Sequence, residues 1–178
     1  MLNNLRILSR TPSVIKHHQL ATFAAGCFWS AQLHFQCVTG VISTQVGFIN
    51  GRTHEPTFEE VCADTTGHAL AVQITFDYTA VSYEDLLEYF WAIQSSYEGL
   101  DDMDLGSPHR SGIYFHSDAQ HATAVASKSK QEALLARDIW TEIAPAGVFY
   151  PADDYHQRYL EKGGHCVHDD KHPCSGSL

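Results

Sequence analysis

Apolar residues follow two different periods along this chain. Every second residue from Leu70 to Phe76 is apolar and alternates with mostly smaller or polar residues, as in a half-buried strand. Between Leu86 and Ile93 the apolar residues recur at helical spacing instead. Patterns of the first kind predict strands over Ala21–Ala25, Val41–Phe48, Ala69–Phe76, Gly112–Phe115 and Ile139–Ala144. Patterns of the second kind predict helices that begin near Trp29, Thr57, Ser82 and Ser117, with a last short helix over Asp153–Leu160.

Capping residues mark where two of these helices begin. Thr57 precedes Glu60 by three residues, the spacing of a capping box, and predicts a short helix that ends at Cys62. Ser117 has a Gln three residues on and predicts a helix to about Ala136. Strands interleaved with helices predict an α+β chain. We expect a two-layer α/β sandwich with a mixed, mostly antiparallel sheet and a ferredoxin-like core.

Length and charge limit the class of protein. The 178 residues fit one domain, and we expect a flexible leader over 1–20, a folded domain over 21–161 and a mobile tail over 162–178. The net charge of −10 argues against a nucleic-acid partner, because phosphate binding needs basic patches. No apolar run has the length of a membrane span, so no membrane partner is expected.

The leader is basic and contains no acidic residue. Arg6, Arg10 and Lys16 all precede Glu55, the first acidic residue of the chain. Mitochondrial transit peptides and disordered bacterial tails share this composition, so the sequence predicts a cytoplasmic protein with the mitochondrion as the alternative. The odd count of five cysteines, without a signal peptide, is not that of a secreted disulfide framework.

Cys27 is the candidate nucleophile. It follows the predicted strand Ala21–Ala25 and precedes the helix that begins near Trp29. Unpaired amides in the first turn of a helix carry partial positive charge, which favours a thiolate. Gly26 allows a sharp turn, and Phe28 and Trp29 place two aromatic rings beside the sulfur. A small buried cysteine is the alternative reading, and these neighbours favour a reactive one.

Several motifs follow one another in a fixed order from about Thr22 to Leu160. They are Gly26-Cys27-Phe28-Trp29, Val46-Gly47-Phe48 with Gly51, His54 to Phe58, Glu59 to Cys62, Thr66 to Ala69, Asp104-Leu105-Gly106, Arg110 to Tyr114 and Tyr155 to Leu160. In this order they resemble the A-type peptide methionine sulfoxide reductase family.

The resemblance implies a thiol-dependent reduction of the S epimer of methionine sulfoxide, free or in peptides. Cys27 would attack the sulfoxide sulfur and become a sulfenic acid, with Phe28 and Trp29 around the substrate methyl group. Cys166 would then form a disulfide with Cys27, and Cys174 would relay it to a thioredoxin-type reductant. The resemblance implies a monomer that needs no organic cofactor and no metal.

This chain departs from the family pattern in the polar half of the site. Leu70 occupies the position of the Glu that donates a proton to the sulfoxide oxygen. Phe58 and His109 each replace a Tyr, whereas Asp104 still matches. One explanation is that Asp104 or His109 has taken over as the acid. The other is a catalytically weakened paralogue that uses its reactive cysteine for redox sensing or binding, or acts on another sulfoxide.

Other His and Cys residues have alternative readings. Cys166, His168, His172 and Cys174 could form a zinc site in the tail. Cys37 and Cys62 are expected to pack in the core. Tyr155, His156 and Tyr159 match the family's last helix, where either packing or a place near the site would explain them.

Overall fold

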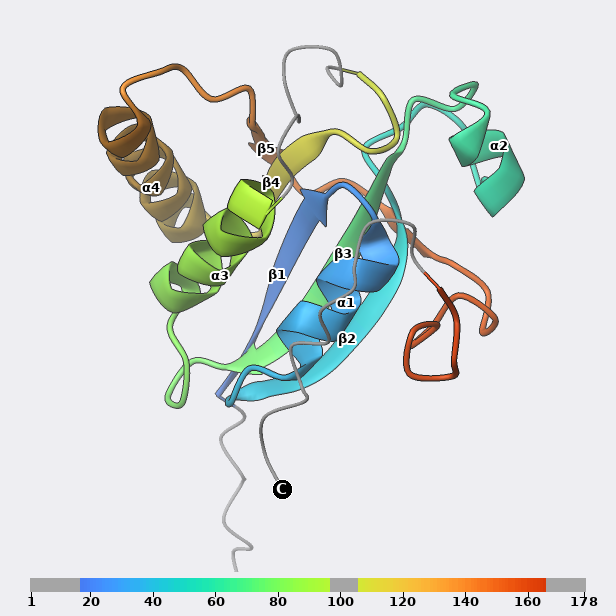
Figure 1. Cartoon of the computed structure of the whole chain (residues 1–178), viewed down its shortest axis with the longest axis horizontal. Coiled ribbons are helices and arrows are strands. Elements are labelled where there is room, and N and C mark those ends of the chain that lie inside the picture. The colour runs from blue at the N-terminus through green and yellow to red at the C-terminus, as the bar shows by residue number, and fades with distance from the viewer. Residues whose placement is uncertain (1–16, 97–105, 166–178) are drawn as a thin grey trace, which may run out of the picture.

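The protein folds around one six-stranded sheet. A computed structural model describes residues 17–96 and 106–165. The strands lie in the order β5-β4-β1-β3-β2-β6, so that β1 and β3 occupy the middle of the sheet (Figure 1). Their bounds are β1 His18–Ala25, β2 Val41–Ile49, β3 Ala69–Asp77, β4 Ser111–Phe115, β5 Glu142–Pro145 and β6 Phe149–Pro151.

All neighbouring strands are antiparallel except β4 and β5, which are parallel. The prediction of an α+β chain with a mixed, mostly antiparallel sheet is therefore confirmed. The helices are α1 Phe28–Gln36, α2 Phe58–Cys62, α3 Tyr83–Ser96 and α4 Asp118–Leu135. In Figure 1, α1 and α3 lie over the same face of the sheet, and α2 projects beyond one end of it.

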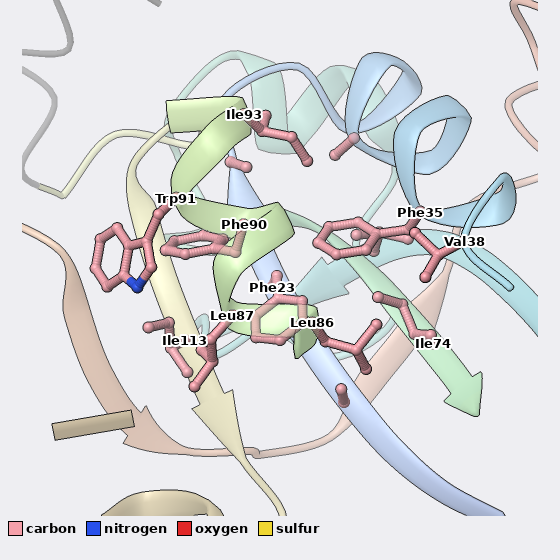
Figure 2. Packing of buried hydrophobic residues seen from close by; sticks show 14 of the residues in the cluster. Phe23, Phe35, Val38, Ile74, Leu86, Leu87, Phe90, Trp91, Ile93 and Ile113 are labelled. Carbon is pink, nitrogen blue, oxygen red and sulfur yellow. The ribbon is translucent and has the colours of Figure 1, made fainter. Parts of the chain in front are cut away.

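The main hydrophobic core lies between the sheet and helices α1 and α3. Phe23 of β1 is fully buried and lies between Phe35 of α1 and Phe90 of α3, with ring centroids 5.3 and 5.4 Å away. Figure 2 shows these rings together with Leu86 and Leu87. The apolar stripe predicted between Leu86 and Ile93 is thus the buried face of α3.

The predicted capping residues are confirmed. Thr57 Oγ1 accepts from the Glu60 amide at 3.2 Å, and the Glu60 carboxylate accepts from the Thr57 amide at 2.9 Å. Ser117 Oγ accepts from the Gln120 amide at 3.2 Å and caps α4. Each cap satisfies amides that have no partner within the helix, which fixes where α2 and α4 begin.

The chain after α4 differs from the prediction. β5 begins at Glu142 rather than at Ile139, and β6 was not expected from the sequence. Residues 153–160 form turns rather than a helix. Arg158 has a φ of 53°, and the Gln157 side chain bonds to the Val46 backbone of β2, so tertiary contacts replace helical hydrogen bonds here.

No helix within the described part of the chain is both long enough and apolar enough to cross a membrane. The predicted leader lies mostly outside the described residues, although β1 already begins at His18. Most of the predicted tail also lies outside them.

Candidate active site

Cys27 lies where β1 turns into α1. Gly26, with a φ of 72°, makes the turn, and Cys27 is the N-cap residue of the helix. The Cys27 carbonyl accepts the first helical hydrogen bond, from the Ala31 amide at 3.1 Å. Its side chain is partly exposed and takes part in no disulfide. A thiol in this position experiences the positive end of α1, which stabilises a thiolate nucleophile.

An aromatic cluster begins directly after Cys27. Phe28 is buried, and its ring centroid lies 5.8 Å from that of Phe58. The Trp29 ring centroid lies 5.7 Å from that of Phe28, 5.8 Å from that of Phe58 and 4.3 Å from that of Tyr159. Residues far apart in the sequence therefore form one apolar wall beside the thiol. The structure brings together Phe28, Trp29 and Phe58, as a substrate-binding role for all three requires.

Leu70 belongs to the same cluster. It is 2% exposed and packs with Phe28 and Phe48, since β2 and β3 place Leu70 directly opposite Phe48. The Leu70 side chain points to the helix-covered face of the sheet, like Val72 two residues on. The position at which the family resemblance predicts a Glu is therefore filled by a buried apolar side chain.

His156 is the polar residue of this aromatic cluster. It is 8% exposed, its ring centroid lies 4.3 Å from Phe58, and it stacks on Trp29 at 5.7 Å. Its Nδ1 is buried and has no hydrogen-bond partner among the described residues. Burial lowers the pKa of His156, against the opposing effect of Asp153 and Glu59. The sequence left open whether His156 and Tyr159 pack in the core or lie near the site. In the structure both rings contact Trp29, two residues after Cys27.

The remaining predicted site residues are not gathered at this cluster within the described chain. The His109 side chain is exposed, and its amide donates to Ser107 Oγ at 3.2 Å. The Leu70 amide donates to the Pro108 carbonyl at 2.7 Å, which links the His109 segment to β3. Asp104, Cys166 and Cys174 lie outside the described residues.

The prediction that Cys37 and Cys62 pack in the core is wrong. Cys37 is exposed at the C-cap of α1 and is disulfide-bonded. Cys62 is exposed at the end of α2 and lies outside any disulfide. Each cysteine lies at the C-terminal end of a helix. The adjacent valine, Val38 or Val61, is buried in its place.

Metal binding finds no support in the described part of the chain. Residues 17–96 and 106–165 contain no group of three or more His, Cys, Asp or Glu side chains placed to hold an ion. The predicted zinc ligands Cys166, His168, His172 and Cys174 lie outside these ranges.

An α+β domain with a reduced thiol at a helix N-terminus beside an aromatic cluster fits the class of cysteine-dependent catalysts. The family model for peptide methionine sulfoxide reductase matches residues 19–173. The chain therefore belongs to the peptide methionine sulfoxide reductase family.

Known relatives agree with this assignment. A peptide methionine sulfoxide reductase of Brassica napus is 46% identical over 147 residues, which cover 82% of this chain and 57% of that protein. The MsrA protein of Methanothermobacter thermautotrophicus is 45% identical over 83% of this chain and 89% of its own length. Methionine sulfoxide reductase A of Corynebacterium diphtheriae has a similar structure, with a TM-score of 0.73 and 30% identity over 91% of this chain and 84% of that one.

Three histidines with lowered pKa values, of which His68 and His156 are buried, predict a loss of stability on acidification. Burial lowers the pKa of His68, His116 and His156, and Arg110 lowers that of His68 further. As the pH falls, these histidines take up protons in the unfolded chain, where their pKa is about 6.5, before they do so in the folded chain. The free energy of unfolding should thus be at its full value above about pH 6.5 and decrease below it.

Urea denaturation at pH 7.5 and at pH 5.5 checks this prediction. The midpoint is expected to fall at the lower pH, and the fall should be smaller in His156→Phe, which keeps a ring but cannot be protonated. An equal or higher midpoint at pH 5.5 would contradict the prediction. The carboxylates with lowered pKa values, Asp77 and Asp85, stay ionised throughout this range and do not interfere.

Proposed function

We propose that this protein reduces methionine S-sulfoxide, free or in peptides, to methionine. The Cys27 thiolate attacks the sulfoxide sulfur, and the oxygen passes to Cys27 as the sulfur–oxygen bond of the substrate breaks. Methionine leaves, and Cys27 becomes a sulfenic acid, so the substrate is reduced by two electrons and the cysteine is oxidised by two. The observation that carries the proposal is the position of Cys27, at the N-terminus of α1 and next to the aromatic cluster.

The aromatic cluster supports the binding half of this proposal. Trp29 and Phe58 are partly exposed and present apolar ring surface, which suits the methyl group and side-chain methylenes of methionine sulfoxide. The buried side chains of Phe28 and Leu70 pack behind that surface. We assign these four side chains to substrate binding and Cys27 to the chemistry.

Protonation of the departing oxygen is the weak step in this chain. Leu70 cannot donate a proton, and general acid catalysis typically contributes about 10²–10⁴-fold. Asp104 and His109 are the proposed donors. The bond between the Leu70 amide and the Pro108 carbonyl supports His109, because it holds the neighbouring residue beside β3. The proposed enzyme is consequently slow compared with one that has a carboxyl group at position 70.

Cys166 and Cys174 are proposed to regenerate Cys27. A thiol condenses with the sulfenic acid to give a disulfide and water, and a second thiol then takes over the disulfide. A thioredoxin-type dithiol returns the cysteines to the reduced state. The cycle balances without a resident cofactor or metal. We propose that it runs in a monomer in the cytoplasm, or in the mitochondrion if the basic leader is a transit peptide.

A weakened paralogue is the alternative function. The observation that favours it is the buried apolar side chain of Leu70, which packs in the aromatic cluster and cannot act as an acid. Such a protein would keep Cys27 for redox sensing or binding, or would act on another sulfoxide. It would form the sulfenic acid with peroxide more readily than with methionine sulfoxide.

We further propose that the sheet and helices form a two-layer sandwich with a ferredoxin-like core. The central strand order β4-β1-β3-β2, with α1 and α3 as the connecting helices, supports a ferredoxin-like core. The placement of α1 and α3 over one face supports a two-layer sandwich (Figure 1).

Turnover of the two epimers of a blocked methionine sulfoxide tests the function. With dithiothreitol as reductant, we expect methionine to form from the S epimer and not from the R epimer. Equal turnover of both epimers would contradict the proposed site, because a fixed aromatic wall and nucleophile distinguish mirror-related sulfur centres. No turnover of either epimer, together with peroxide oxidation of Cys27, would favour the sensing alternative.

A further inference from the structure

A pocket lies outside the aromatic cluster of the candidate active site. Its volume is about 450 Å³. Residues from four separate segments line it, and those that matter here are Asn50, Arg52, Gly67, Arg110, Trp140 and Glu142. None of these residues is part of the aromatic cluster around Phe28. The pocket is therefore a separate feature that the proposed chemistry leaves without a role.

Two arginine side chains meet at Gly67 in this pocket. The Arg110 guanidinium donates to the Gly67 carbonyl at 3.2 Å. Arg52 lies over the same glycine, since a Cβ at Gly67 would be 3.4 Å from the Arg52 Nε. With a φ of 70°, Gly67 has a backbone conformation that other residues rarely adopt. Two guanidinium groups close together form a local cationic site in a chain of net charge −10.

Only one of these two positive charges is neutralised by the described protein. Arg110 is buried, and its Nε donates to Glu142 Oε2 at 2.9 Å, while another of its nitrogens donates to the Ser107 carbonyl at 3.1 Å. The Arg52 guanidinium is exposed and has no hydrogen bond or ion pair with any residue in 17–96 or 106–165. Arg110 is thus fixed as part of the wall, and Arg52 remains available to an anion.

Trp140 adds an apolar surface to the pocket. It is 55% exposed, which is unusual for so large an apolar side chain. An indole beside an available guanidinium suits a ligand with an extended chain and a carboxylate, because one part packs and the other forms a charge-assisted hydrogen bond.

The pocket lies within reach of a substrate at Cys27. Ser111 lines the pocket and pairs with Ala25 across β4 and β1, and Cys27 follows two residues after Ala25. The spacing of paired strands and of consecutive Cα atoms puts Cys27 within about 13 Å of Ser111. An extended peptide spans that distance in about two to four residues.

We infer that this pocket binds a carboxylate carried by the oxidised substrate, two to four residues from the methionine sulfoxide. The inference rests on the proposed reductase function and names a substrate class for it: peptides with a nearby acidic side chain, or with a nearby free C-terminus. Arg52 supplies the charge and hydrogen-bond donors, Arg110 holds Gly67 and the pocket wall, and Trp140 packs on the intervening chain.

Binding of matched peptides to a Cys27→Ser protein tests the inference without turnover. Each blocked peptide carries one methionine S-sulfoxide, followed three residues later by Asp or by Asn. A second pair ends three residues after the sulfoxide in a free or an amidated carboxyl group. Calorimetry should show that at least one carboxylate peptide binds about fivefold more tightly than its neutral partner. An exposed charge pair with good hydrogen bonds contributes an effect of this size. Which pair differs identifies the source of the carboxylate.

Two charge variants locate the effect. Arg52→Gln in the same background should reduce the preference for the carboxylate peptide to about one. Lys130→Gln removes the same charge from α4, where Lys130 pairs with Glu88, and should leave the preference unchanged. Equal binding of both members of both peptide pairs overturns the inference, and so does a preference that survives Arg52→Gln. A preference that depends on Arg52, in a protein whose parent form turns over no sulfoxide, would support the pocket and reject the proposed function.

Discussion

Cys27→Ser is expected to abolish methionine sulfoxide reduction. The serine hydroxyl is not ionised at neutral pH and cannot accept the oxygen as a sulfenic acid, so kcat/KM should fall by at least about 10⁴-fold, as for the loss of other catalytic nucleophiles. The measurement is turnover of the S epimer with dithiothreitol. The substitution should not disturb the fold, because Ser is a favoured N-cap residue and α1 should form at least as well as before.

Cys62→Ser is the matched control for that experiment. Cys62 is exposed and lies outside any disulfide, but it is at the end of α2 and outside the helix N-terminus that activates Cys27. This variant should keep the parent activity. Turnover that survives in Cys27→Ser, or that disappears in Cys62→Ser, would show that the nucleophile has been assigned to the wrong cysteine.

Leu70→Glu is expected to raise turnover by about 10²–10⁴-fold, the typical contribution of a general acid. The new carboxyl group would project from β3 into the cluster of Phe28 and Phe48, on the face of the sheet that α1 covers. Burial in that apolar cluster should raise its pKa and keep it protonated, as a proton donor must be. The same burial should cost stability, by about 1–3 kcal/mol for a polar group without a full set of partners.

Leu70→Gln separates proton donation from polarity. Gln has the size and hydrogen-bonding capacity of Glu but cannot act as an acid in this range, so its turnover should stay near that of the parent. Thermal unfolding of both variants checks that each is folded. An equal gain in Leu70→Gln would mean that oxygen binding, rather than proton transfer, was missing. No gain in a folded Leu70→Glu would mean that His109 or Asp104 already supplies the proton.

The sequence predicted the secondary structure best where local signals decide it. The capping residues Thr57 and Ser117 mark helix starts by bonding to amides three residues away, and both starts were predicted correctly. The segment 153–160 was predicted as a helix, and it forms turns instead. Its Gln157 side chain bonds to the backbone of Val46, more than a hundred residues earlier, and a contact of that kind leaves no local pattern.

The candidate site was predictable in its motifs and not in its contacts. Cys27, Phe28 and Trp29 are neighbours in the sequence, so their proximity was certain. Leu70 joins them only through the register that places it opposite Phe48, and His156 joins them through a segment with no regular structure. The pocket at Arg52 had no motif at all, because its residues come from segments that only the folded sheet brings together.

The two outer strands of the sheet have a consequence for how this protein meets damaged chains. β5 and β6 are only four and three residues long, and they end in Pro145 and Pro151. Short outer strands with proline offer few backbone groups for a foreign strand to pair with. Oxidation of buried methionines disrupts protein cores, and the strands this exposes can pair with open sheet edges. In the proposed function, the short outer strands would let an oxidised protein present its methionine sulfoxide without adding a strand to this sheet.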